Sequence, residues 1–317
     1  MKISRTRPGE DSGRPKIIII TGPTCTGKSR LALDLAAKWG GEIVSADSMQ
    51  VYRFMDIGTA KPTRAERAAV NHYLIDVVRP DEEFNASMFA DLASRAIRDI
   101  HAGDRAVFVA GGTGLYLRVL TGGLLRAPGA DPDLRRRYRE EILRHGNEYL
   151  YEKLRQVDRE AAETIRPNDA VRIIRALEIM ESTGESIVGL RRRHGFGARP
   201  YRYLKIGLLA DRSALNRRID ARCDDMVRLG LAEETEKLLG MGFGEDLKPM
   251  NSFSYRHMTG YVLGRLALPE AVELMKRDTR HFAKRQWTWF KGEKDIDWRD
   301  PSDSDRISDE IRAFLEA

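Results

Sequence analysis

Residues 16–29 read K-I-I-I-I-T-G-P-T-C-T-G-K-S, and this stretch decides the fold. The run of isoleucines predicts a buried strand, and residues 22–29 match the phosphate-loop pattern G-x-x-x-x-G-K-[ST]. Helical periodicity follows at once and extends to Lys38. A strand, a glycine-rich loop and a helix in this order direct backbone N–H groups and a helix N-terminus at a phosphate. We therefore expect a nucleotide or a pyrophosphate to bind here, and the motif alone does not distinguish them.

The residues of this loop are the candidate phosphate contacts: Gly22, Pro23, Thr24, Cys25, Thr26, Gly27, Lys28 and Ser29. The Lys28 ammonium can reach terminal phosphates, and the Ser29 hydroxyl can ligate Mg²⁺, which is the cofactor we expect. Cys25 and Cys223 are the two cysteines of the chain. Two cysteines provide neither a disulfide framework nor a zinc site, which favours a reducing, cytoplasmic compartment. We interpret Cys25 as a small loop residue rather than a redox switch.

Strand-like and helix-like segments alternate outward from the loop. The expected strands are 42–46, 73–78, 105–110 and 201–210, and the expected helices are 87–102, 113–121 and 269–291. This rhythm predicts an α/β fold with a parallel sheet flanked by helices. Between the expected strands 105–110 and 201–210, the sequence from 131 to 189 is charged and has a helical pattern. We therefore predict a core of 16–125 and 199–317, a helical insertion domain of 126–198 and a disordered tail of 1–15.

Composition sets broad limits. The chain has 317 residues, of which 42% are hydrophobic, so it can bury a large core without disulfide or metal staples. No apolar run approaches the roughly 20 residues that a membrane-spanning helix needs, so no membrane association is expected. A net charge of +6 permits a polyanionic partner without requiring one.

Polar residues follow two further strands. Asp47 and Gln50 come directly after the second strand, where an open parallel sheet binds its ligands. A carboxylate there can bind Mg²⁺ or act as a general base, but Asp47 with Gln50 three residues later equally fits a helix capping box. The turn Gly111-Gly112-Thr113-Gly114 follows another strand, so Thr113 can hydrogen-bond a phosphate or a catalytic group.

The segment 276–294 holds seven Lys or Arg residues against two acidic ones, interleaved with tryptophan and phenylalanine. Such a pattern suits RNA phosphates and stacked bases, and it also fits a packed helix with solvated charges. The insertion has 15 basic and 13 acidic residues, so most of its charges are expected on a solvated face. Arg135 is one candidate there for clamping an RNA backbone.

The segments GPTCTGKS, ADSMQVYRFMDIGTAKP, GGTGLYL, RIIRALEI and RHFAKRQWTWF occur in the order and rough spacing of the bacterial tRNA dimethylallyltransferases. The chain resembles that family from about Lys16 to Asp300. The resemblance implies transfer of a dimethylallyl group from dimethylallyl pyrophosphate to N6 of an adenosine. That adenosine lies 3′ of the anticodon in tRNAs reading codons that begin with U. A P-loop NTPase-like fold and a tRNA anticodon stem-loop as partner are implied as well, and we expect a monomer.

The resemblance also implies roles for residues. It makes Asp47 the catalytic carboxylate, Thr113 its partner and Arg222 a pyrophosphate ligand, which favours the general-base interpretation of Asp47. It places the insertion domain of 126–198 against tRNA, together with these residues: Asp47, Ser48, Met49, Gln50, Arg172, Arg175, Tyr255, Arg256, Lys284, Arg285, Gln286 and Trp289. The chain departs from the family pattern at Phe253-Ser254, where Ile or Val and Gly are usual, and at Val171, where Gln is common.

Three other functions compete with this interpretation. A prenyltransferase acting on free AMP, ADP or ATP would share the phosphate loop and the carboxylate, but it has little need for the insertion or the basic segment 276–294. A small-molecule kinase would explain the phosphate loop alone. A non-catalytic RNA-binding protein would require a vestigial loop, although Lys28 and Ser29 are intact.

Overall fold

The computed structural model describes residues 13–125, 127–195 and 197–317, so most of the predicted tail lies outside the described residues. The chain forms two compact units. The core unit consists of the chain up to Thr121 and from Pro200 onward, and the insertion unit is Gly122–Arg199. The insertion unit thus starts before the expected position 126, because the chain leaves the core at the end of helix α4 (Gly114–Gly122). In the described chain, no helix combines the length and apolar character needed to cross a membrane.

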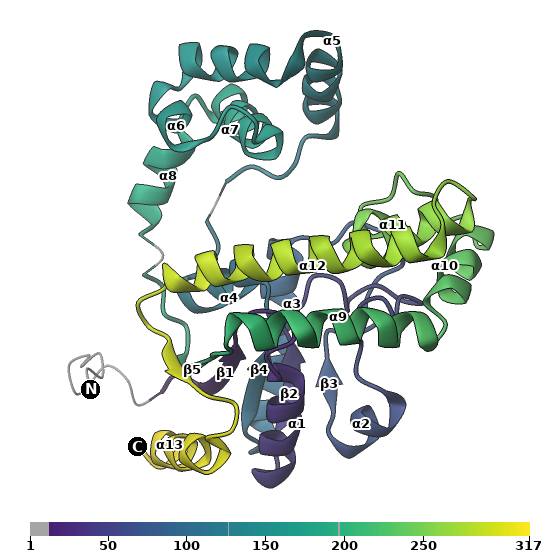
Figure 1. Ribbon diagram of the computed structural model, residues 1–317. Coiled ribbons are helices and arrows are strands. Elements are labelled where there is room, and N and C mark those ends of the chain that lie inside the picture. The colour runs from purple at the N-terminus through teal and green to yellow at the C-terminus, as the bar shows by residue number, and fades with distance from the viewer. Residues whose placement is uncertain (1–12, 126, 196) are drawn as a thin grey trace. The chain divides into compact units, whose positions relative to one another are not determined.

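The core unit contains one sheet of parallel strands in the order β3-β2-β4-β1-β5-β6 (Figure 1). The strands are β1 (Lys16–Thr21), β2 (Glu42–Ser45), β3 (His72–Tyr73), β4 (Val107–Ala110), β5 (Arg202–Leu208) and β6 (Asp297–Arg299). The isoleucine-rich β1 lies inside the sheet, with Ile18 opposite Phe108 on one side and Leu204 on the other. The predicted α/β fold with a parallel sheet is confirmed.

Two strands differ from expectation. The predicted strand 73–78 is only two residues long, because Leu74 and Asp76 adopt left-handed backbone conformations with φ of 64° and 56°. The chain then turns back, and the Val77 N–H donates to the Val51 carbonyl instead of joining the sheet. Sequence patterning also did not identify β6, a three-residue strand beside β5.

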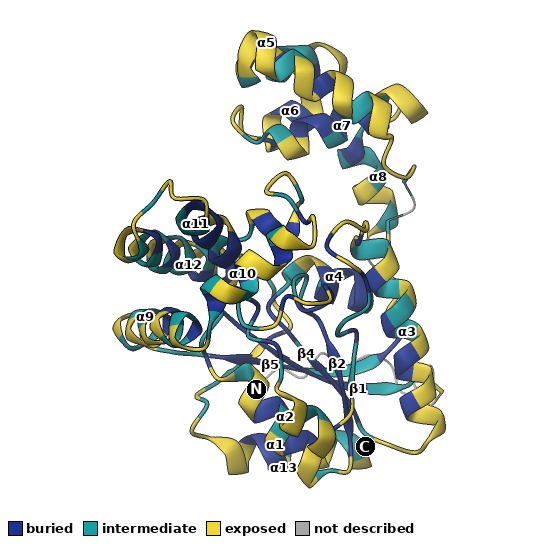
Figure 2. Cartoon of the chain, turned by 90° about the vertical axis from the view of Figure 1, so that its right-hand side faces the viewer, coloured by how far each residue is buried: buried dark blue, intermediate teal, exposed yellow. Residues whose placement is uncertain are grey.

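Helices cover both faces of the sheet. They are α1 (Lys28–Lys38), α2 (Arg64–Ala69), α3 (Ala86–Ala102), α4 (Gly114–Gly122), α9 (Arg212–Arg228), α10 (Leu231–Gly240), η1 (Pro249–Asn251), α11 (Phe253–Val262), α12 (Leu268–Lys291) and α13 (Ser304–Glu316). Ile18 and Ile20 pack in a core with α1 and α13, whereas Ile17 and Ile19 pack in a core with α3, α4 and α9. Successive strand side chains point to opposite faces, so a run of isoleucines suits a strand covered on both sides. Figure 2 shows these buried strands between the helices.

The insertion unit is helical. It contains α5 (Pro132–Val157), α6 (Arg159–Thr164), α7 (Ala170–Thr183) and α8 (Ile187–His194), and α5 bends at Gly146, where φ is 84°. Its core includes Tyr138, Leu150 and Leu177. The buried Glu178 carboxylate accepts from Arg135 at 3.0 Å and from Arg175 at 2.5 Å.

Candidate active site

The phosphate loop has the backbone that its glycines permit. Gly22 and Gly27 have φ of 135° and 93°, and Cys25 has φ of 62°. A side chain at Gly22 would place its Cβ 2.9 Å from the Leu208 carbonyl oxygen, so only glycine allows this approach to β5. The loop therefore runs from the carboxyl end of β1 straight into α1, as the motif predicts.

Basic side chains gather at the mouth of the loop. A groove is lined by Cys25, Gly27, Lys28, Ser29, Arg30, Arg218 and Arg222. Lys28 Nζ donates to the Pro23 carbonyl at 2.6 Å, and Arg222 Nη1 donates to Thr24 Oγ1 at 3.4 Å. Burial and the Arg222 guanidinium lower the pKa of Lys28 to about 8. Cations from α1 and α9 thus converge where a pyrophosphate would carry its charge.

Asp47 holds a turn just beyond β2. Its Oδ1 accepts from the Met49 N–H at 2.8 Å and from the Gln50 N–H at 3.4 Å, whereas Oδ2 has no hydrogen-bond partner among the described residues. No helix follows, so the capping box does not form. The Gln50 side chain instead accepts from Ser45 Oγ at 2.9 Å and donates to the Ala60 carbonyl at 3.2 Å. Gln50, expected against tRNA, has its amide engaged within the protein.

Thr113 lies against this turn. Its Oγ1 accepts from the Ser48 N–H at 3.0 Å, and its own N–H donates to the Ala46 carbonyl at 3.2 Å. A Cβ on Gly111 would approach the Ala46 carbonyl oxygen to 2.2 Å, so the glycine allows the loops after β2 and β4 to touch. The structure therefore brings together Asp47 and Thr113, which the sequence separates widely.

Helix α12 joins these loops through Gln286, which is buried. Gln286 Oε1 accepts from the Thr24 N–H at 2.8 Å, and Nε2 donates to the Gly112 carbonyl at 2.9 Å. One turn further on, Trp289 packs against Gly114, and the Arg118 guanidinium lies 4.2 Å from the centroid of its ring. Gln286 and Trp289, both predicted to contact tRNA, also hold the loops of the site. Sequence reasoning missed Arg118 altogether.

Tyr255 also differs from expectation. Its side chain is fully buried, and its hydroxyl donates to Glu234 Oε1 at 2.5 Å. The Glu234 carboxylate also accepts from the backbone N–H groups of Asp56, Ile57 and Gly58 at 2.9–3.1 Å. Tyr255 therefore supports the loop after Met55 rather than a surface for RNA. No local signal marks this contact, because Glu234 lies on another helix.

The arginines predicted to contact tRNA have protein partners as well. Arg256 pairs with Asp278 at 2.5 Å, and Arg172 lies 3.3 Å from Asp169. The Arg172 pair is exposed, and such pairs contribute little to stability and open readily. Arg256 is exposed too, but its partner Asp278 is largely buried and also contacts His257 and Arg277. Arg135 and Arg175 instead bind the buried Glu178, so their guanidinium groups are committed to the insertion unit.

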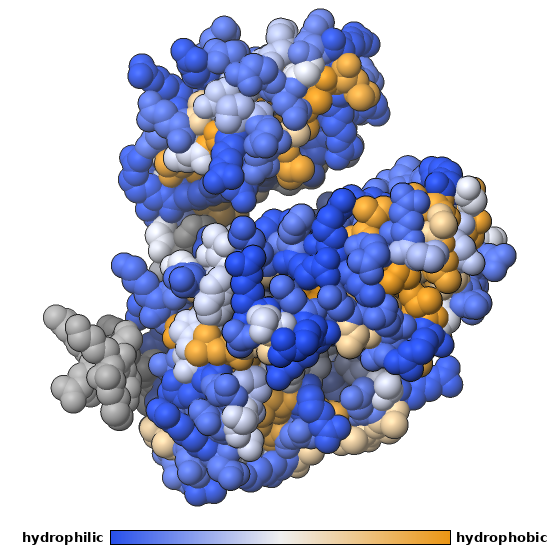
Figure 3. Space-filling model, in the orientation of Figure 1, coloured by the Kyte–Doolittle hydropathy of each residue, from blue (hydrophilic) through white to orange (hydrophobic). Residues whose placement is uncertain are grey.

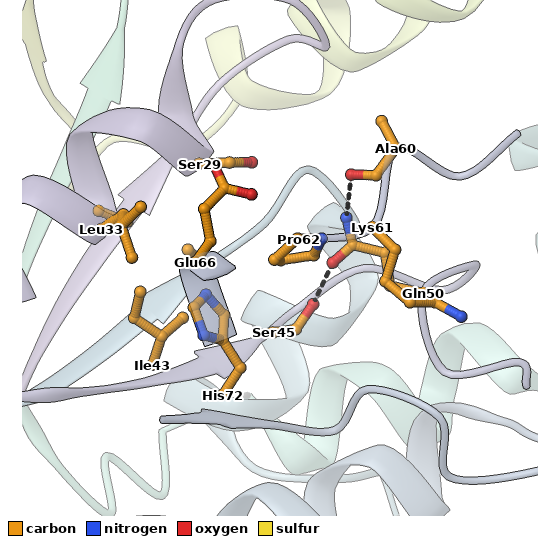
Figure 4. A pocket seen from close by; sticks show the side chains of 12 residues that line it. Ser29, Leu33, Ile43, Ser45, Gln50, Ala60, Lys61, Pro62, Glu66 and His72 are labelled. Atoms are coloured by element: carbon orange, nitrogen blue, oxygen red, sulfur yellow. Dashed lines mark hydrogen bonds between the residues drawn. The ribbon is translucent and has the colours of Figure 1, made fainter. Parts of the chain in front are cut away.

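A cavity of about 110 Å³ lies between α1 and α2 (Figure 4). Its lining mixes polar and apolar residues, among them Ser29, Leu33, Pro62 and His72. Burial lowers the pKa of His72, so its imidazole is mainly neutral at pH 7. Ser29 lines both this cavity and the basic groove, so the two adjoin at the start of α1.

Residues 50–293 match the family model of the IPP transferases. The chain belongs to this family. A relative from Syntrophus aciditrophicus named tRNA dimethylallyltransferase 2 is 50% identical over 95% of this chain and 97% of its own. The tRNA dimethylallyltransferase of Geobacter metallireducens is 45% identical over 96% of this chain and 99% of its own.

Solved structures agree with this family assignment. The tRNA isopentenylpyrophosphate transferase of Bacillus halodurans is 37% identical, with a TM-score of 0.71 over 96% of this chain and 97% of its own. A eukaryotic dimethylallyltransferase described as acting on tRNA is 28% identical, with a TM-score of 0.74 over 90% of this chain and 74% of its own. The P-loop NTPase-like fold expected for this IPP transferase is therefore confirmed.

Proposed function

We propose that this protein is a tRNA dimethylallyltransferase. It transfers the dimethylallyl group of dimethylallyl pyrophosphate to N6 of the adenosine 3′ of the anticodon, in tRNAs reading codons that begin with U. The names of its relatives support the activity. The observation that carries the proposal is the pairing of a basic phosphate loop with a carboxylate whose Oδ2 has no protein partner among the described residues.

The phosphate loop would hold the pyrophosphate of the donor. Bond breaking occurs between the allylic carbon and the bridging oxygen, so negative charge develops on the leaving pyrophosphate. Lys28 and Arg222 flank the groove in which that charge would gather. The Thr113 hydroxyl accepts from Ser48, so its own proton stays available to donate to a substrate oxygen.

Asp47 would act on the nucleophile. An adenine N6 amine is a weak nucleophile, because its lone pair is delocalised into the ring. Asp47 Oδ1 is fixed by two backbone N–H groups, which leaves Oδ2 to take a proton from N6 as the C–N bond forms. Oδ1 of this carboxylate therefore has the structural role, and Oδ2 has the catalytic role.

We propose Mg²⁺ as the cofactor. Among the described residues, no three His, Cys, Asp or Glu side chains converge on a possible metal site. Mg²⁺ commonly takes one or two protein ligands together with phosphate oxygens and water, and the exposed Ser29 hydroxyl at the start of α1 fits that requirement. Bound there with pyrophosphate, the ion would neutralise charge on the leaving group.

We further propose a cytoplasmic monomer whose partner is the tRNA anticodon stem-loop. Both cysteines are free, as a reducing compartment would keep them. The competing substrate is a free adenine nucleotide. The cations Lys284 and Arg285, exposed on α12 without carboxylate partners among the described residues, favour an extended polyanion over a mononucleotide.

The test uses the purified full chain with labelled dimethylallyl pyrophosphate, Mg²⁺ and one acceptor at a time. The acceptors are AMP and an anticodon stem-loop that carries the target adenosine. We expect label on the stem-loop and none on AMP. Label on AMP alone would establish the free-nucleotide prenyltransferase. ATP hydrolysis without any prenyl transfer would refute both prenyltransferase assignments.

A further inference from the structure

The cations of α12 fall into two groups. The cations before His281 are paired with carboxylates, as Lys276–Asp224, Arg277–Asp278 and Arg280–Asp220. Lys284, Arg285 and Lys291 are exposed, and none of them has a carboxylate partner among the described residues. The positive charge that this helix presents to a polyanion is therefore concentrated in its last two turns, from Lys284 to Lys291.

An aromatic pair lies beside these cations. The rings of Phe253, at the start of α11, and Phe282, on α12, are 5.0 Å apart between centroids and tilted by 44°. The Arg285 guanidinium lies 5.8 Å from the centroid of each ring. Both phenylalanines are only partly buried, so ring surface remains accessible. In Figure 3 the surface over α12 is largely hydrophilic, and hydrophobic side chains gather toward its α10–α11 end.

This group lies next to the proposed active site along the same helix. Gln286 follows Arg285 directly and binds both the phosphate loop and the turn that carries Thr113. Phe282 lies one helical turn before Gln286, so the aromatic pair and the site are rigidly connected through α12. A loop nucleotide near the target adenosine would therefore meet this surface.

We infer that Phe253, Phe282 and Arg285 form a stacking site for an unpaired nucleobase of the RNA substrate. Aromatic rings and guanidinium planes stack on bases without requiring a particular sequence, and the adjacent Lys284 supplies charge for the phosphate backbone. The inference rests on the proposed function, because it concerns binding of that same RNA.

The experiment measures RNA binding without prenyl donor, so it does not depend on catalysis. Anticodon stem-loops carry the fluorescent base 2-aminopurine at one loop position at a time. Stacking on Phe253 and Phe282 predicts quenching at one loop position on binding. The double variant Phe253→Leu/Phe282→Leu should lose that quench and bind roughly 10- to 100-fold more weakly. Phe253→Trp should retain both, because it keeps a stacking ring.

Trp39→Leu is the matched control, because it also removes an aromatic ring that faces an arginine. The guanidinium of Arg312, on α13, lies 5.7 Å from the centroid of the Trp39 ring, and neither residue is on α11 or α12. It should bind and quench like wild type. The stacking site would be overturned if the double variant Phe253→Leu/Phe282→Leu melts at the wild-type temperature and still binds and quenches like wild type. Wild type that binds with the quench but transfers no prenyl group would refute the proposed function and still support this site.

Discussion

Gln286 accepts a hydrogen bond from the backbone N–H of Thr24 at 2.8 Å, although 262 residues separate the two in the chain. The same amide donates to the Gly112 carbonyl, so one buried side chain fixes the phosphate loop against the turn that carries Thr113. The last long helix of the chain thereby sets the spacing between the parts of the site proposed to bind pyrophosphate and to act on the acceptor.

Gln286→Leu should therefore weaken pyrophosphate binding. Leucine fills similar volume but leaves the Thr24 N–H and the Gly112 carbonyl without their partner, which costs about 1–3 kcal/mol for each buried group. We expect pyrophosphate affinity to fall by roughly 10-fold or more in calorimetric titration. Thr288→Val, on the same helix but exposed, is the control and should bind like wild type. Equal affinity in both variants would show that the loop keeps its shape without Gln286.

Asp47→Asn separates the two functions of that carboxylate. Asparagine Oδ1 can still accept from the Met49 and Gln50 N–H groups, so the turn should persist, but the amide cannot take a proton from N6. We expect kcat to fall by roughly 10²- to 10⁴-fold while pyrophosphate and stem-loop affinities stay near wild type. Single-turnover transfer at saturating donor would measure this. A variant with wild-type turnover would exclude the general base.

The sequence predicted what depends on short-range pattern. The isoleucine run and the loop after it define β1, and the alternation of segments defines the parallel sheet. Pattern could not predict β3 or β6, since a strand of two or three residues carries no periodicity. It also could not predict the partners of Gln286 or Tyr255, because residue type does not reveal a partner on a distant segment.

Lys28 should make pyrophosphate binding pH-dependent. Its pKa is lowered to about 8 by burial and by Arg222, so the ammonium is mainly charged at pH 7 and loses its proton as pH rises through 8. A bound pyrophosphate favours the charged form, so affinity should be greatest below pH 8 and weaken above it. Lys28→Arg is the reference, because arginine stays charged throughout this pH range. The pH dependence that remains in this variant comes from pyrophosphate itself and can be subtracted from the wild-type profile. Affinities measured from about pH 6.5 to about pH 9.5 should diverge between the two proteins, and parallel profiles would contradict this assignment.

Arg135 should stabilise the insertion unit rather than bind RNA. Burial acts to raise the pKa of Glu178, but Arg135, Arg175 and the Asp131 N–H outweigh it and lower that pKa overall. Arg135→Ala should reduce protection of α7 amides against hydrogen exchange by about 1–3 kcal/mol, because the carboxylate keeps only part of its pairing. Arg172→Ala removes an exposed pair and should change protection by less than about 0.5 kcal/mol. If Arg135→Ala leaves hydrogen exchange of the α7 amides unchanged but weakens stem-loop binding, Arg135 contacts tRNA as predicted from the sequence.

Lys284→Ala with Arg285→Ala should reduce the salt dependence of stem-loop binding. Each phosphate contact releases counterions, and on single strands it adds roughly 0.7 to the slope of log affinity against log salt. Losing two contacts should therefore flatten the slope by about 1.4. Arg277→Ala with Arg280→Ala removes the same formal charge, but Asp278 and Asp220 already neutralise those side chains, so the slope should change less. Equal flattening in both double variants would mean that RNA responds to the net charge of α12. A smaller effect in the second pair would locate the RNA contact at Lys284 and Arg285.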